Sequence, residues 1–335
     1  PRFSTSSAAT ATSSFVQCFK NNEARSSFNK EFNRREVISG RTIDLVFFDK
    51  HSNPIKTWFD NQKWSSLLKL DCVIYLTLIK EFFANLSYDT QSAPHTLDCF
   101  VKGVSFTLNP NIINSIIKTS KEGKRITHTV ATHHLPNYSH LIGLRFLTNN
   151  PELHDHVAVS GKDLSLELRL LHHIITHNIT PRSSRFDAIT YGHTFLIWAL
   201  ATGYLIDFGF LVTHCIIQAH KQNNQALPFG MIFTKLFKHF NIDLKGEEKV
   251  PRDPSRYGAE PLRNMGYSLI NRIWTKTKKP SLSSPGFSTP GSSLPSSSTR
   301  HFSSFDLSAP PSSSDLFSLS LKIDHCHDPN PPLWV

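Results

Sequence analysis

Histidine is the residue type with the most capacity for chemistry in this chain, with 18 copies among 335 residues. One group lies in a polar stretch, where the nearby acids are Glu152 and Asp155. A zinc site needs three or four ligands held in fixed geometry, and no predicted helix positions these side chains. We interpret them as ordinary polar residues of a loop rather than as metal ligands. The group comprises His128, His133, His134, His140, His154 and His156.

A second group of histidines lies on the most regular predicted helix. His172 and His173 are adjacent, so they point about 100° apart, and we expect one to face the core and the other solvent. His177 follows His173 by four residues and shares its face. The pair of His173 and His177 could bind a metal weakly, but the sequence offers no third ligand. The histidines at residues 325–327 (HCH) lie in the tail, where nothing would hold them in the geometry of a metal site. We therefore expect neither a metal nor a cofactor.

Signatures of nucleophilic and phosphate-binding catalysis are absent from the sequence. It contains neither G-x-S-x-G nor G-x-x-x-x-G-K-[ST]. Asp187, Asp207 and Asp243 could supply the carboxylates of a two-metal transposase, but a turn, a helix cap and a helix exit account for them. The five cysteines are far apart and form no C-x-x-C, which is typical of a reducing compartment. We predict that the chain is not an enzyme and is intracellular, nuclear or cytoplasmic, because no signal peptide is visible.

The charge balance favours an acidic partner. Lysine and arginine total 36 against 26 acidic residues, a net charge of +10. The densest basic runs are short, and aromatic residues alternate with them only weakly, so stacking on single strands is poorly supported. Solvated surface charge is one interpretation, and sequence-independent nucleic-acid binding is the other. The candidate contacts are Lys121, Lys124, Arg125, Lys276, Lys278 and Lys279.

The spacing of apolar residues predicts a mainly α fold: a single helical domain with a small β-hairpin, flanked by disordered segments. Asn109, Thr190 and Asp207 are expected to cap helices. The strongly apolar residues 194–217 are long enough to span a membrane, but Asp207 would be costly there, so we predict two buried helices and no membrane span. The hairpin is expected within residues 97–106, turning at Lys102 and Gly103. Helices are expected at about residues 71–86, 110–117, 141–147, 163–177, 190–203, 207–222, 228–240 and 260–274.

Composition divides the chain into three parts. Residues 58–275 have the apolar content of a folded domain. We expect residues 1–57 to be largely disordered or weakly ordered. Residues 276–335 are expected to form a disordered tail, because a segment rich in serine and proline buries too little surface to offset its ordering entropy.

Five blocks of sequence resemble a known family. They are residues 81–86 (EFFANL), 100–106 (FVKGVSF), 163–178, 180–187 (TPRSSRFD) and 228–237 (PFGMIFTKLF). Their order and spacing are similar to the putative plant transposon protein domain, which occurs in envelope-like or accessory products of long-terminal-repeat retrotransposons of the Athila and Calypso type. The resemblance implies a retroelement origin and defines no catalytic residue.

Taken with the residues, this resemblance favours a noncatalytic accessory or interaction protein that binds a protein partner or self-associates. The alternatives are a sequence-independent nucleic-acid-binding module and, third, a metal-dependent enzyme.

Overall fold

A computed structural model of the chain describes residues 17–276 apart from 51–52, 90–95, 127–134, 136, 155–156, 252 and 272. All of these residues belong to one of the two compact units into which the chain divides, Pro1–Pro280. Lys278 and Lys279 lie outside the described residues, as do the histidines at 128, 133, 134 and 156 and those of the tail.

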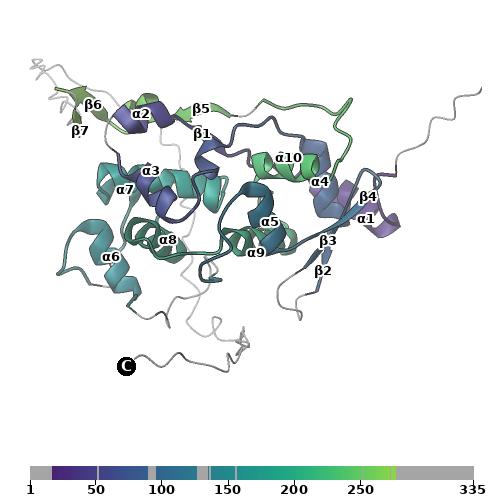
Figure 1. Ribbon diagram of the computed structural model, residues 1–335, viewed down its shortest axis with the longest axis horizontal. Helices are drawn as coiled ribbons and strands as arrows, with labels where there is room; N and C mark the ends of the chain where they lie inside the picture. The colour runs from purple at the N-terminus through teal and green to yellow at the C-terminus, as the bar shows by residue number, and fades with distance from the viewer. Residues whose placement is uncertain are drawn as a thin grey trace, which may run out of the picture. The chain divides into compact units, whose positions relative to one another are not determined.

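Apolar helices form the centre of this unit (Figure 1). α5 packs along α9, and α10 contacts both α4 and α5. Their buried faces share one continuous hydrophobic core, which includes Phe82, Phe208 and Phe233. The predicted mainly α class is confirmed. The bounds are α4 (Leu76–Asn85), α5 (Pro110–Ile117), α8 (Tyr191–Thr202), α9 (Phe208–Lys221) and α10 (Gly230–His239).

The three predicted helix caps are confirmed. The side chains of Asn109, Thr190 and Asp207 each accept a hydrogen bond from the backbone N–H three residues later, at 3.0, 3.3 and 3.1 Å. Gly203 ends α8 with φ at +76°, so the apolar stretch forms two helices, as predicted. Among the described residues, no helix has both the length and the apolar character needed to cross a membrane.

Two helices begin later than the apolar spacing predicts. α4 starts at Leu76 rather than near 71, because Ile74 forms an isolated antiparallel bridge with Val250. α7 (Leu166–Ile174) starts after Ser165, whose side chain accepts a hydrogen bond from the Leu168 N–H at 3.3 Å. A short π-helix, η4 (Ile175–Ile179), then carries the chain to Pro181, where helical structure ends as expected. The predicted short helix near residue 141 is α6 (His140–Thr148).

Small sheets flank the helices. The predicted hairpin is confirmed as β3 (Leu97–Val101) and β4 (Val104–Leu108), and Lys102 and Gly103 turn it with positive φ angles. β2 (Ser87–Tyr88) extends this sheet beside β3. A separate parallel pair joins β1 (Arg41–Ile43) to β5 (Asp253–Tyr257).

The helix predicted over residues 260–274 is wrong. A short helix, α11 (Ala259–Asn264), ends before Gly266, which adopts a φ of +84°. The chain then forms an antiparallel hairpin, β6 (Tyr267–Ile270) and β7 (Ile273–Lys276). Four apolar residues of this hairpin, Tyr267, Ile270, Ile273 and Trp274, are aromatic or β-branched, and these types favour strands. Trp274 of β7 packs against Phe47, with ring centroids 5.8 Å apart.

The structure also corrects the expectation of disorder or weak order for residues 17–57. This segment contains α1 (Asn22–Lys30), α2 (Leu45–Lys50) and the start of α3 (Ile55–Asn61). Phe32 and Phe48 are buried in the core. A few aromatic anchors therefore supply the apolar area that the overall composition of the segment conceals.

The EFFANL block contains a buried acid. Glu81 of α4 accepts a hydrogen bond from the Lys102 N–H at 2.5 Å, which ties α4 to the turn of the hairpin. Burial is the main cause that raises the pKa of Glu81 to about 7. Between pH 4.5 and 7 the folded chain therefore holds a proton that the unfolded chain has lost, so this group lowers stability as pH rises through that window.

We expect Glu81→Gln to stabilise the protein at pH 8 by about 2 kcal/mol, because glutamine keeps the acceptor without a buried charge. At pH 4 the two proteins should unfold at nearly the same denaturant concentration. Urea unfolding at both pH values measures this, and the exposed Glu152→Gln is the control. A Glu81→Gln protein less stable than wild type at pH 8 would contradict the assignment.

Candidate functional site

The predicted basic contacts lie in two places. Lys121, Lys124 and Arg125 share one exposed loop, whereas Lys276 ends β7 and donates from Nζ to the Lys162 carbonyl at 3.4 Å. Arg125 already forms an ion pair with an acid of the protein. Its Nε donates to Asp207 Oδ2 at 3.3 Å, with side chains 45% and 1% exposed respectively. Lys121 and Lys124 are exposed cations of the same loop, and neither takes part in an ion pair among the described residues.

Asp207 holds the basic loop against α9. Its backbone N–H donates to the Lys124 carbonyl at 3.0 Å, and its Oδ1 accepts from Asn114 Nδ2 at 2.7 Å. Thr119 Oγ1 in turn donates to Asn114 Oδ1 at 2.8 Å. Asp207 is therefore a helix cap within a buried polar network, the role that the sequence suggested for it. Asp187 and Asp243 lie on loops. In the part of the chain that the structure describes, no group of three histidines, cysteines or acids could hold a metal ion.

The second histidine group is a buried cluster. His172 is fully buried and His173 half-buried, so neither is simply solvent-facing. His172 Nε2 lies 3.4 Å from Nδ1 of His193, a residue of α8 that sequence spacing could not connect to it. His177 Nδ1 lies 2.7 Å from the Tyr257 hydroxyl. Burial, and then neighbouring positive charge, lowers the pKa of His172 to about 3 and that of His173 to about 4. Both are neutral at pH 7.

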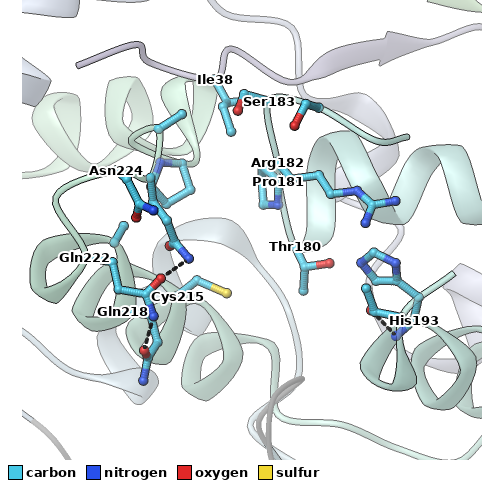
Figure 2. A pocket seen from close by; sticks show the side chains of 16 residues that line it. Ile38, Thr180, Pro181, Arg182, Ser183, His193, Cys215, Gln218, Gln222 and Asn224 are labelled. Carbon is cyan, nitrogen blue, oxygen red and sulfur yellow. Dashed lines mark hydrogen bonds between the residues drawn. The ribbon is translucent and has the colours of Figure 1, made fainter. Parts of the chain in front are cut away.

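A cavity lies beside this cluster, and His193 is part of its lining. It encloses about 410 Å³ between residues 180–184 and the end of α9. Figure 2 shows Gln218, Gln222 and Cys215 on one side and Arg182 and His193 on the other, with Thr180 between them. Asn224 and Gln225 complete the amide-rich wall. We call this cavity the amide pocket.

The polar groups of the amide pocket are only partly satisfied within the described part of the protein. Arg182 donates from Nη2 to the Ala188 carbonyl at 2.6 Å, and its guanidinium extends toward His193 (Figure 2). Thr180 Oγ1 is buried and has no hydrogen-bond partner among the described residues. Gln222 and its neighbours form a short chain of amides, in which Gln222 Nε2 donates to Gln218 Oε1 at 3.4 Å. The pocket therefore presents donors and acceptors together with a cation.

A cysteine and a histidine share this pocket, which raises the question of nucleophilic catalysis. Burial raises the pKa of Cys215 to about 12, so its sulfur stays a protonated thiol at pH 7. Catalytic cysteines need the opposite shift, because the thiolate is the nucleophile. The Cys215 and His193 pair is therefore poorly suited to covalent catalysis.

Comparison with known proteins places the chain in a family. The model of the putative plant retrotransposon-related domain matches residues 60–243, more than half of the 335 residues. The chain belongs to this family, which confirms the relationship to plant retrotransposons inferred from the sequence blocks. The match includes α4 to α10 and nearly all of the residues lining the amide pocket. Searches of curated proteins and of solved structures gave no match.

Proposed function

We propose that this chain is a noncatalytic accessory protein of plant retrotransposon origin that binds an extended peptide segment of a partner protein in the amide pocket. The observation that carries the proposal is the composition of that pocket. Side-chain amides each offer a donor and an acceptor, which is the pairing that an extended peptide backbone needs. A volume of about 410 Å³ accommodates a short peptide segment.

Arg182 gives the proposed partner a chemical preference. Its Nη2 donates to the Ala188 carbonyl, while its Nε is buried and has no hydrogen-bond partner in the described part of the chain. An acidic side chain or a terminal carboxylate would form a charge-assisted hydrogen bond there. The partner segment is therefore expected to be extended and to carry a carboxylate.

The protonated Cys215 thiol supports a binding role over an enzymatic one. We assign the chain to the accessory products of Athila- or Calypso-type elements, on the strength of the sequence blocks. We also place it inside the cell, in the nucleus or cytoplasm. The free thiols of Cys72 and Cys99 fit that reducing compartment.

Nucleic-acid binding remains the alternative function, and one observation favours it. Lys121 and Lys124 are exposed on a loop that the buried bonds of Asp207 hold in place. Contacts of this kind would be electrostatic and would not depend on base sequence.

A peptide-library selection on the full chain, followed by anisotropy titration of the enriched peptides, tests the proposal. We expect acidic extended peptides to be enriched, and Arg182→Gln and Gln222→Ala each to weaken their binding about tenfold, the effect of losing a charge-assisted or amide hydrogen bond. The exposed Lys238→Gln removes one positive charge outside the pocket and is the matched control. Peptide binding that survives both pocket variants would contradict the proposal.

A further inference from the structure

We propose that a second cavity, lined by Arg41, Arg169 and His173, binds the phosphoryl group of a phosphate monoester. This anion pocket encloses about 330 Å³ and is separate from the amide pocket. The inference goes beyond the proposed function, because it assigns another site and another class of ligand. It rests on how poorly the buried cation of this cavity is satisfied by the protein itself.

Arg169 is a buried guanidinium with too few partners among the described residues. It is 7% exposed, its Nη1 donates one long hydrogen bond of 3.5 Å to the Met265 carbonyl, and its Nε is buried without a partner. Arg35 is equally buried at 7%, yet all of its nitrogens donate hydrogen bonds. A buried charge is costly unless it is paired and hydrogen-bonded. The cavity beside Arg169 is therefore suited to an anion that would complete its bonds.

The remaining walls add positive character and a donor. His173 contributes Nε2, which is buried and has no hydrogen-bond partner in the described part of the chain. Arg41 also lines the cavity, and its guanidinium lies 5.6 Å from the centre of the Tyr257 ring. Two guanidinium groups and an imidazole around one small volume suit a phosphoryl group better than a carboxylate. A phosphoryl group carries more charge and three acceptor oxygens.

Two carboxylates also line the cavity and restrict what can enter. Asp187 and Glu260 are exposed, and none of the ion pairs among the described residues joins either of them to Arg169. The charges that act on the His173 imidazole are those of Arg169, Asp187, Arg41 and Arg182. The Tyr257 hydroxyl donates a hydrogen bond to the backbone carbonyl of His173. Like-charge repulsion keeps a bound phosphoryl group away from these carboxylates and beside Arg169, and it disfavours a ligand with further charges along its length, such as a nucleic-acid backbone. A compact monoester, with its charge concentrated on one group, fits better.

The site can be tested on the full chain with inorganic phosphate, a phosphoserine peptide and adenosine monophosphate as separate probes. We expect calorimetric titration to show saturable binding of at least one monoester, weakened at least tenfold in Arg169→Met and less in Arg169→Lys. Lys238→Gln, the matched loss of an exposed charge, should bind like wild type. Preference for the peptide or for the nucleotide would identify the source of the phosphoryl group.

A measurement on the wild-type chain alone excludes misfolding of a variant as the cause of weaker binding. Nuclear magnetic resonance of the wild-type chain should show the His173 ring signals shifting with phosphate, while those of the exposed His154 stay in place. The inference is overturned if neither phosphate nor a monoester binds, or if Lys238→Gln weakens binding as much as Arg169→Met. It is also overturned if an oligonucleotide binds through Arg169 while the monoesters do not. Arg169→Met should leave peptide binding at the amide pocket unchanged, so the two proposals can fail separately.

Discussion

Replacing Gly209 by alanine is expected to lower the free energy of unfolding by about 3 kcal/mol, the cost of overpacking a rigid contact. A Cβ atom at this position would lie 2.1 Å from the Pro110 carbonyl oxygen. The obstacle is backbone, so no side-chain rotation can relieve it, and α5 and α9 would have to move apart. Asn114 Oδ1 also accepts from the Gly209 N–H at 2.7 Å, so the same movement would strain the buried network of Asp207.

Gly203→Ala is the matched control for this experiment. A Cβ atom at Gly203 would meet nothing within 4 Å, but the φ of this residue is +76°. Alanine there should cost about 1 kcal/mol through backbone strain alone. Guanidinium chloride unfolding of both variants measures the difference. Equal losses at the two glycines would show that the α5–α9 contact is not tight.

Stability is expected to fall by on the order of 3 kcal/mol between about pH 6.5 and pH 4, because buried histidines resist protonation. The pKa of His172 is lowered to about 3, and those of His173 and His220 to about 4, in each case chiefly by burial. The unfolded chain gains protons on these residues below about pH 6.5 while the folded chain does not. Unfolding therefore becomes more favourable as pH falls. Glu81 acts in the opposite direction over part of this window, and the three histidines outweigh it.

Urea unfolding at half-unit pH intervals measures the slope. His172→Gln should flatten it by about 1.4 kcal/mol per pH unit near pH 5, the contribution of one proton. His154→Gln, at an exposed position, should leave the slope as it is. A flat profile down to pH 4 in the wild type would show that these histidines are hydrated rather than buried.

Local signals in the sequence predicted most of the helices. The caps at Asn109, Thr190 and Asp207 were predictable because a polar side chain just before an apolar run satisfies backbone donors without help from the rest of the fold. The segments whose structure was predicted wrongly depend on contacts with residues far away in the sequence. Residues 267–276 become a hairpin that packs on Phe47, and Phe32 becomes buried only once α4 lies beside it.

The candidate sites could be predicted much less well. The amide pocket combines residues that follow α7 with residues at the end of α9, and no sequence spacing shows that they meet. The sequence alone does not distinguish the environment of Arg169 from that of Arg35. Only their hydrogen bonds show that Arg35 is satisfied and Arg169 is not. The ion pair of Arg125 with Asp207 could not be predicted for the same reason, because the two residues lie in separate segments of the sequence.

One measurement tests the central claim of peptide binding most directly: anisotropy of the full chain with an enriched acidic peptide and with labelled DNA and RNA, over one salt series. We predict peptide binding that persists at physiological salt and is weakened about tenfold in Arg182→Gln, with no nucleic-acid binding at that salt. The contradicting result has two parts. The chain binds nucleic acid with a binding constant whose logarithm falls linearly with the logarithm of the salt concentration, and this binding disappears when Lys121 and Lys124 are replaced by glutamine. At the same time, no peptide binding is detected above background. The exposed basic loop, rather than the amide pocket, would then be the functional site.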